Sequence, residues 1–215
     1  MFEDVSQFLI KLAIYAPPML MAVTFHEVSH GVVASMLGDP TARLAGRLTI
    51  NPIKHLDPMG LLVFVLTQMI GWAKPVPVDS RYFKNPRSGM ALVSAAGPAS
   101  NFVLAVLSAL MLRVLEIAAS ASGGSPLAGS VLVPLIYMTV ASIQVNLALG
   151  VFNLLPIPPL DGGHLLMGLL PLRWAYELSR LERWGFFIVL LLAVTGVLGR
   201  FLGPVVSYFY NILIR

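Results

Sequence analysis

Long apolar stretches dominate this chain, and they limit it to the folds that a lipid bilayer accommodates. Hydrophobic residues make up 57% of the sequence and charged residues only 11%, whereas a soluble domain has about 25% charged residues. Stretches of this length and composition span membranes as helices. The chain is therefore predicted to be an all-α polytopic membrane protein, with one compact domain over residues 1–215.

Four stretches are long enough for a transmembrane helix, which needs about 20 residues. They are predicted at residues 8–37, 90–119, 127–155 and 186–202. Pro17-Pro18 is expected to break or kink the first, and Gly203-Pro204 to interrupt the pattern after the fourth. Residues 205–214 then continue the last span or form a surface helix, so one or two C-terminal segments occupy about 184–214.

Two shorter regions do not fit a spanning helix. Residues 59–72 are apolar over only about 14 positions, which favours a re-entrant or interfacial segment. Residues 42–50 loosely alternate between apolar and polar side chains, which predicts a short strand or hairpin. The prolines of Gly71–Val78 favour an extended loop.

The basic residues predict which side of the membrane each loop occupies. Loops 39–57, 73–88 and 171–183 hold ten of the fourteen Lys and Arg residues, and basic loops stay in the cytoplasm. This placement explains the net charge of +4 without a nucleic-acid partner. The lipid bilayer is then the expected surrounding of a multi-pass membrane protein.

A metal-binding pattern lies inside the first apolar stretch. His26-Glu27-Val28-Ser29-His30 is an H-E-x-x-H motif, and on a helix its two histidines share one face. They can hold one Zn²⁺ ion, with Glu27 beside the ion's water. Three polar side chains within a bilayer helix are costly unless they are paired or bound to a metal. The chain has no cysteine, which excludes a thiolate site.

A catalytic zinc site takes a third protein ligand, and three residues are candidates. Asp161 follows the helix-breaking Pro156/Pro158/Pro159 run, and broken helices at membrane depth line sites or cavities. Its alternative role is to cap the short helix expected at 163–170. His164 shares a helical face with Asp161 but is interpreted as a packing residue. His55 lies in a polar loop and is interpreted as a solvated histidine.

Hydrolysis would also need a donor for the oxyanion of the tetrahedral intermediate. Asn153 and Asn101 are the amides available at membrane depth. Either can instead form a hydrogen bond between helices, and both interpretations stay open for each residue.

Three motifs in this order resemble the site-2 protease family, the intramembrane zinc metalloproteases of peptidase family M50. They are His26-Glu27-x-x-His30, Ala96-Gly97-Pro98-Ala99-Ser100-Asn101 and Asn153-x-x-Pro156-x-Pro158-x-x-Asp161-Gly162. The resemblance covers about residues 20–170 and favours a compact bacterial subgroup without a PDZ or CBS domain.

The resemblance implies a three-helix catalytic core that holds one zinc ion within the membrane, near the cytoplasmic face. It implies His26, His30 and Asp161 as zinc ligands, Glu27 as catalytic base and Asn153 as an aid to the transition state. The implied substrate is a transmembrane protein. Because a helix hides its peptide bonds, an extended substrate could pair with an exposed edge at 42–50 or 74–78. The alternative for the second segment is that Pro75 and Pro77 simply form a rigid turn.

Two other functions fit parts of the pattern. A membrane zinc carrier could pass the ion through the same three ligands, but the internal repeats usual in transporters are not seen. A non-catalytic scaffold could retain a structural zinc ion, but it would not need Glu27. The sequence indicates no oligomeric state.

Overall fold

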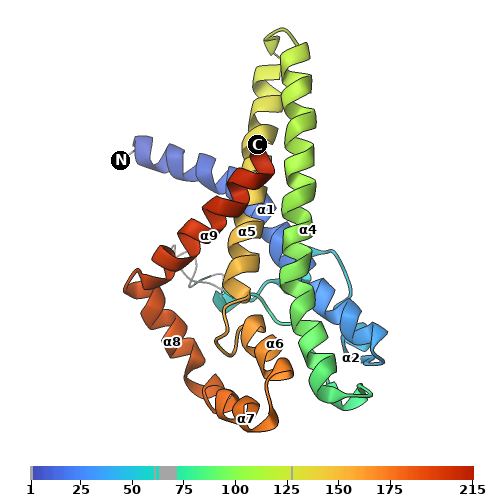
Figure 1. The fold of residues 1–215 in the computed structure, drawn as a ribbon. Helices are drawn as coiled ribbons and strands as arrows, with labels where there is room; N and C mark the ends of the chain where they lie inside the picture. The colour runs from blue at the N-terminus through green and yellow to red at the C-terminus, as the bar shows by residue number, and fades with distance from the viewer. Residues whose placement is uncertain (1, 61, 63–71, 127) are drawn as a thin grey trace.

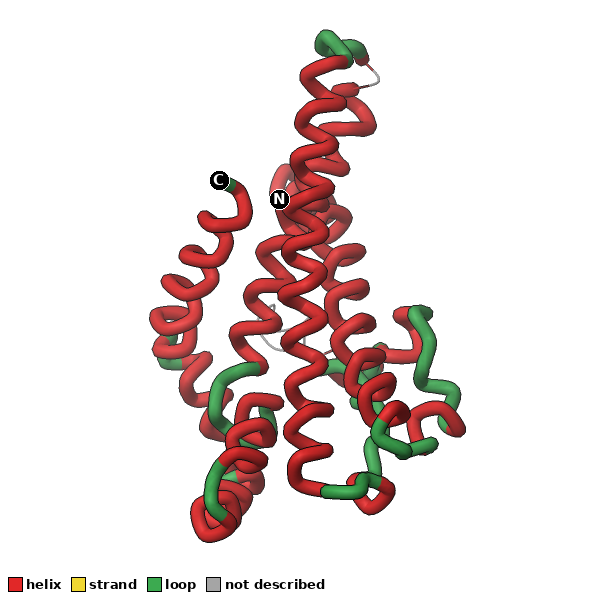
Figure 2. The backbone as a smooth tube through the Cα atoms, turned by 45° about the vertical axis from the view of Figure 1, so that its right-hand side comes forward, coloured by secondary structure: helices red, strands yellow, loops and turns green. Residues whose placement is uncertain are grey.

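The protein is almost entirely helical. A computed structural model describes residues 2–60, 62, 72–126 and 128–215, and its described residues contain helices, loops and a single isolated β-bridge (Figures 1 and 2). The helices are α1 (Phe2–Met36), α2 (Thr41–Leu44), η1 (Pro52–His55), η2 (Ser80–Tyr82), α4 (Pro86–Ala121), η3 (Ala128–Leu132), α5 (Val133–Asn153), α6 (Asp161–Leu169), α7 (Leu172–Arg180), α8 (Glu182–Val194) and α9 (Val197–Ile214).

Four described helices are long and apolar enough to cross a membrane. They cover Val5–Met36, Pro86–Ala121, Gly129–Asn153 and Val197–Ile214. The first three match the spans expected from the sequence, which confirms the all-α polytopic class. The first helix continues through Pro17 and Pro18 and ends before Gly38, whose positive φ of 102° suits the residue after a helix.

The fourth predicted span, at 186–202, is wrong. The chain breaks instead at Gly196, whose φ of 72° lies in the left-handed region. The 13 residues of α8 are too few to span the hydrocarbon core, whereas α9 runs on through Pro204. The left-handed backbone at Gly196 ends the helix there although the apolar pattern continues. Pro204 does not end α9, because a proline is tolerated inside a membrane helix.

Helix α4 is the central element of the fold, and α1, α5 and α6 pack against it (Figure 1). Small residues allow α4 and α5 to approach closely, and their shared core is buried. It consists of Ala105, Ala109, Leu112, Ile143 and Leu147. This packing brings residues from three distant parts of the sequence to one level of the bundle.

The strand or hairpin predicted at 42–50 is not present. Residues 41–44 form α2, and 47–50 have no regular structure. His55 is also not solvated: its side chain is 1% exposed and its Nε2 lies 2.8 Å from the Thr49 carbonyl oxygen. Arg43 is exposed, but Arg47 is buried and donates to the Lys74 carbonyl oxygen. The polar positions of this region therefore do not share one wet face, as the alternation of a strand would require.

The segment predicted to be re-entrant, residues 59–72, lies mostly outside the described residues. The chain on either side of it is joined by an antiparallel bridge between Leu56 and Ala73. The Lys74 amide also donates to the His55 carbonyl, at 2.9 Å. Residues 73–79 therefore begin next to the end of the 39–57 loop.

Candidate metal centre

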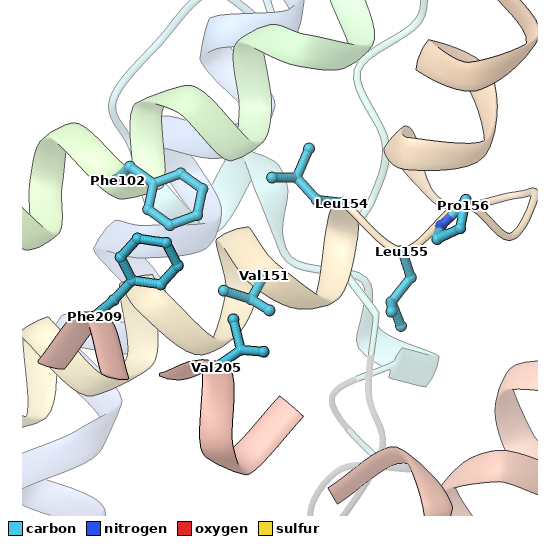
Figure 3. A pocket seen from close by; sticks show the side chains of 7 residues that line it. All are labelled: Phe102, Val151, Leu154, Leu155, Pro156, Val205 and Phe209. Atoms are coloured by element: carbon cyan, nitrogen blue, oxygen red, sulfur yellow. The ribbon is translucent and has the colours of Figure 1, made fainter. Parts of the chain in front are cut away.

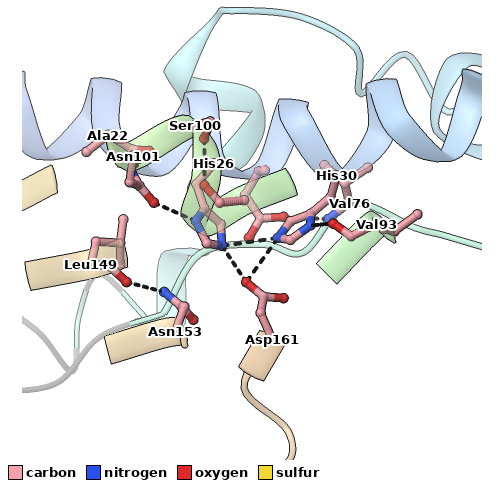
Figure 4. A network of polar contacts seen from close by, with 12 residues as sticks. Ala22, His26, His30, Val76, Val93, Ser100, Asn101, Leu149, Asn153 and Asp161 are labelled. Carbon is pink, nitrogen blue, oxygen red and sulfur yellow. Dashed lines mark hydrogen bonds and ion pairs between the residues drawn. The ribbon is translucent and has the colours of Figure 1, made fainter. Parts of the chain in front are cut away.

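Three side chains that could hold a metal ion meet where α1, α4 and α6 pack together. His26 and His30 lie one turn apart on α1, and Asp161 is the first residue of α6 (Figure 4). The two Nε2 atoms are 3.1 Å apart. Asp161 Oδ2 lies 3.1 Å from His26 Nε2 and 3.3 Å from His30 Nε2. The three atoms form a nearly equilateral triangle.

The other ring nitrogen of each histidine is held by an acceptor. His26 Nδ1 donates to Asn101 Oδ1 and His30 Nδ1 to the Val93 carbonyl oxygen, each at 2.7 Å. A neutral imidazole that carries its proton on Nδ1 has only a lone pair on Nε2. Asp161 Oδ2 is buried and has no hydrogen-bond donor. Three electron-rich atoms therefore face one point, which is what a cation site requires.

The triangle fits a tetrahedral zinc ion. Zinc bonds to histidine nitrogen and carboxylate oxygen are about 2.0–2.1 Å, which places neighbouring ligand atoms about 3.3 Å apart. The observed sides of 3.1–3.3 Å match one face of that tetrahedron. The fourth position of such an ion is left for water or substrate, as in catalytic zinc sites.

Close backbone packing sets the positions of these side chains. A Cβ atom on Gly97 would lie 2.4 Å from His30 Nε2 and 2.6 Å from His26 Cε1, so both imidazoles rest directly on the backbone of α4. A Cβ atom on Gly162 would lie 2.2 Å from the Leu154 carbonyl oxygen. The loop after α5 thus packs against the first turn of α6 and fixes Asp161.

Asp161 does not cap α6, which was its alternative role. The N-cap of α6 is Leu160, and no side chain caps it. The carboxylate points toward the two imidazoles instead (Figure 4).

Glu27 is held by a backbone amide from outside the helix bundle. The Val76 N–H donates to Glu27 Oε2 at 2.8 Å, and a Cβ atom on Gly31 would lie 3.0 Å from the Val76 side chain. The absence of a side chain at Gly31 lets residues 73–79 lie directly on α1. The sequence gives no periodic signal for this contact.

The substrate edge expected at 74–78 is largely occupied. The amides of Lys74 and Val76 donate within the protein, and Pro75 and Pro77 have no N–H. The Lys74 carbonyl accepts from Arg47 Nη2 at 2.6 Å. Pairing of a substrate with these two N–H groups would require Lys74 to leave the His55 carbonyl and Val76 to leave Glu27.

The two asparagines are placed differently. Asn101 is fully buried and contacts His26 directly, so it supports a candidate ligand and also joins helices. Asn153 lies at the end of α5, on the side of Asp161 (Figure 4), and its Nδ2 donates to the Leu149 carbonyl at 2.9 Å. His164 stays outside the cluster and lines a separate pocket beside Arg87.

One buried polar residue, Asn146, was not anticipated as part of the site. It lies on α5, is 1% exposed, and accepts a hydrogen bond from Asn101 Nδ2 at 3.0 Å. A polar side chain at membrane depth is a functional candidate by default, so its position could have singled it out.

An apolar groove of about 540 Å³ lies beside the end of α5 (Figure 3). It has no titratable side chain and therefore supplies no acid–base chemistry. Its lining is Phe102, Val151, Leu154, Leu155, Pro156, Val205 and Phe209.

Comparison with known proteins agrees with this class of site. The model of peptidase family M50 matches residues 14–195. "Putative zinc metalloprotease YwhC" of Bacillus subtilis is 39% identical over 189 residues, which are 88% of this chain and 84% of that protein. "Putative zinc metalloprotease Rip2" of Mycolicibacterium smegmatis is 33% identical over 196 residues, which are 89% of this chain and 71% of that protein. No solved structure is significantly similar to the chain.

Fold and site together define a membrane protein with a candidate histidine–carboxylate metal centre next to a glutamate. The chain belongs to peptidase family M50. It is accordingly a metalloprotease, and zinc is the metal for which its donor atoms are suited.

Proposed function

We propose that this protein is an intramembrane zinc metalloprotease, which hydrolyses peptide bonds in or near the transmembrane segments of other membrane proteins. The observation that carries the proposal is the triangle of His26 Nε2, His30 Nε2 and Asp161 Oδ2, with sides of 3.1–3.3 Å. It lies between helices that are apolar enough to span the bilayer. A substrate must therefore present its peptide bond at membrane depth.

The chemistry divides among the residues around this triangle. His26, His30 and Asp161 hold one zinc ion, which when bound acidifies a water molecule and polarises the scissile carbonyl. Glu27 accepts the proton of the attacking water and delivers it to the leaving amine. The Val76 amide holds Glu27 Oε2 and so fixes the orientation of the carboxylate.

Asn153 is the proposed donor to the oxyanion of the tetrahedral intermediate. One of its N–H groups binds the Leu149 carbonyl, and an amide nitrogen carries two. Its second N–H group is available for the developing negative charge, which a preorganised donor stabilises.

The site is proposed to lie nearer the cytoplasmic face of the bacterial cell membrane. Gly97, which contacts both histidines, is ten residues along α4 from Arg87 and sixteen from Arg113. At 1.5 Å per residue these separations are about 15 Å and about 24 Å. Arg87 belongs to the basic loops, which stay in the cytoplasm.

We further propose a single membrane domain over residues 1–215. Its catalytic core covers about 20–170, which includes all the residues assigned above. The C-terminal segments at about 184–214 complete the bundle, and α9 packs against α5.

The proposal is tested by proteolysis in detergent with purified wild type and Glu27→Gln. The substrate is a single-span protein with a helix-destabilised segment, and bound zinc is quantified in both proteins. We expect equal zinc and at least about 100-fold slower cleavage by Glu27→Gln, because a general base contributes about 10²–10⁴-fold. Equal cleavage by both would exclude Glu27 as the base. Zinc transport into liposomes without cleavage would identify a carrier instead.

A further inference from the structure

A continuous chain of buried amides connects α5 to the metal centre. It runs from Asn146 on α5 through Asn101 on α4 to His26 on α1 (Figure 4 shows its Asn101–His26 end). These three side chains are 1%, 0% and 6% exposed. Buried polar groups of this kind are costly unless each hydrogen bond is made, so the direction of every bond can be worked out.

The Ser142 carbonyl group, at the α5 end of the chain, fixes the direction of the hydrogen bonds. Asn146 Nδ2 lies 2.9 Å from the Ser142 carbonyl oxygen, which can only accept, so the amide nitrogen must face it. Asn146 Oδ1 then faces Asn101 and accepts from its Nδ2 at 3.0 Å. The reverse orientation of Asn146 would place two oxygens against each other.

The orientation of the Asn101 amide follows from its neighbours in the same way. Its Nδ2 faces both Asn146 Oδ1 and the Ala22 carbonyl oxygen, at 3.0 Å and 3.2 Å. Its Oδ1 is left facing His26 Nδ1 at 2.7 Å. Only a protonated Nδ1 satisfies this oxygen, and a neutral His26 then has its lone pair on Nε2, the atom that faces His30 and Asp161.

We propose that Asn146 is a positioning residue of the metal centre, which acts through Asn101 to fix the tautomer and the ring orientation of His26. It does not touch the metal. The inference rests on the proposed zinc site and deepens it, since it assigns to α5 a part in metal binding in addition to the proposed role of Asn153.

A purely structural role would be to join α4 and α5, as another pair already does. Ser108 Oγ on α4 and Ser142 Oγ on α5 lie 2.8 Å apart. Ser142 lies one turn before Asn146 on α5, and its Oγ also accepts from Asn146 Nδ2 at 3.3 Å, beside the shorter bond of that nitrogen to the Ser142 carbonyl oxygen. The serine pair contacts no candidate ligand. Ser108→Ala is therefore a matched control, because it removes an α4–α5 hydrogen bond and leaves the amide chain intact.

The test is a double-mutant cycle that measures the zinc dissociation constant of the full-length protein in detergent. We expect Asn146→Leu to weaken zinc binding about tenfold, the lower end of the effect of removing groups that support a ligand. The double variant should bind zinc as weakly as Asn101→Leu alone and no more weakly, because Asn146 acts only through Asn101. Ser108→Ala should bind zinc as the wild type does.

Several outcomes would overturn the inference. Unchanged zinc binding by Asn146→Leu, an equal loss in Ser108→Ala, or additive losses in the double variant would each reduce Asn146 to a packing residue. Absence of zinc binding by the wild type would instead refute the metal site itself, so the two failures are distinguishable.

A measurement on the unmodified protein covers the case in which Asn146→Leu does not fold. ¹⁵N NMR of labelled histidine in metal-free wild type reports which ring nitrogen carries the proton. We expect the His26 proton on Nδ1 and a bare Nε2. A proton on Nε2 would contradict the proposed direction of the chain.

Discussion

At the scale of single residues, the centre depends on a position that has no side chain. Gly97 is the point where both imidazoles contact α4. Any Cβ atom there would occupy the space of the His30 ring, so α1 and α4 would have to separate. The glycine of the Gly97-Pro98-Ala99-Ser100-Asn101 motif thus permits the ligand geometry that Asn101 and Val93 then fix by hydrogen bonds.

Gly97→Ala should therefore damage zinc binding as well as stability. Overpacking a close contact destabilises by about 1–3 kcal/mol, and the displaced His30 would no longer face Asp161. We expect zinc content well below one per chain and a lower melting temperature in detergent.

Gly199→Ala supplies the control for this substitution. Gly199 lies in α9, and a Cβ atom there would contact nothing within 4 Å. It should keep full zinc content. Equal zinc content in Gly97→Ala and Gly199→Ala would show that the close contact at Gly97 is unimportant.

At the scale of elements, a buried carboxylate anchors residues 73–79 to the turn after α1. Asp39 is fully buried. Its Oδ2 accepts from the Asp79 amide at 2.7 Å, and its Oδ1 accepts from the amide and the hydroxyl of Thr41. Arg47 holds the same segment at Lys74. Between these two anchors lies Val76, whose amide binds Glu27.

The anchor predicts a specific dependence on pH. Burial alone would raise the pKa of Asp39, but the hydrogen bonds from Thr41 and the Asp79 amide outweigh it, so the pKa lies below its usual value. A carboxyl with a lowered pKa adds stability above its unfolded pKa of about 3.9, and this stability is lost as the pH falls through the folded value.

Asp39→Asn should remove this contribution. We expect a lower melting temperature than wild type at pH 7, and a difference between the two proteins that shrinks as the pH falls below about 4, because the carboxyl of the unfolded chain is protonated first and that of the folded protein follows at its lower pKa. Proteolysis should also slow, because residues 73–79 no longer hold Glu27 firmly. A difference in melting temperature that stays constant from pH 7 to pH 3 would contradict this role of the Asp39 charge.

At the scale of the whole molecule, α4 is longer than the bilayer is thick. Its 36 residues extend about 54 Å at 1.5 Å per residue, against about 30 Å of hydrocarbon. Arg113 pairs with Glu116 at 3.2 Å and donates to the Ile214 carbonyl oxygen near the end of α9. Beyond Arg113, α4 extends past the end of α9, and η3 lies alongside it, as Figure 1 shows.

This arrangement predicts opposite exposure of the two ends of α4. The chain has no cysteine, so a single introduced cysteine reports its own position. A cysteine at Gly124 should react with an impermeant thiol reagent added outside intact cells, and one at Lys84 should react only after the cells are opened. Labelling of Lys84→Cys but not Gly124→Cys would reverse the proposed orientation.

Much of this molecule could be predicted from local patterns. The three apolar spans at the start of the chain are continuous in sequence, and the i, i+4 spacing of His26 and His30 places them on one helical face whatever surrounds them. Asp161 could be singled out because a carboxylate after a proline-rich break has few other uses at membrane depth. These predictions needed only the helical period and the cost of polar groups in hydrocarbon.

Other features could not be predicted because they depend on contacts between distant segments. The fourth span was misplaced since Gly196, not Gly203-Pro204, carries the backbone reversal. The environments of His55 and Arg47 differ from the expectation because these side chains bind the backbone carbonyls of Thr49 and Lys74 rather than water. The hydrogen bond between Asn146 and Asn101 joins positions 45 residues apart, and no helical or strand periodicity predicts such a contact.

The sequence by itself determined the membrane class, the helical form and the chemical identity of the centre, since hydrophobicity and ligand type are properties of the residues. Tertiary packing alone decided how the centre is built. It brought Asp161 within 3.3 Å of both imidazoles, placed the Val76 amide on Glu27 and aligned the amides that direct His26. The physical reason is that a buried hydrogen bond or metal ligand is defined by its partner, and the partner is supplied by the fold.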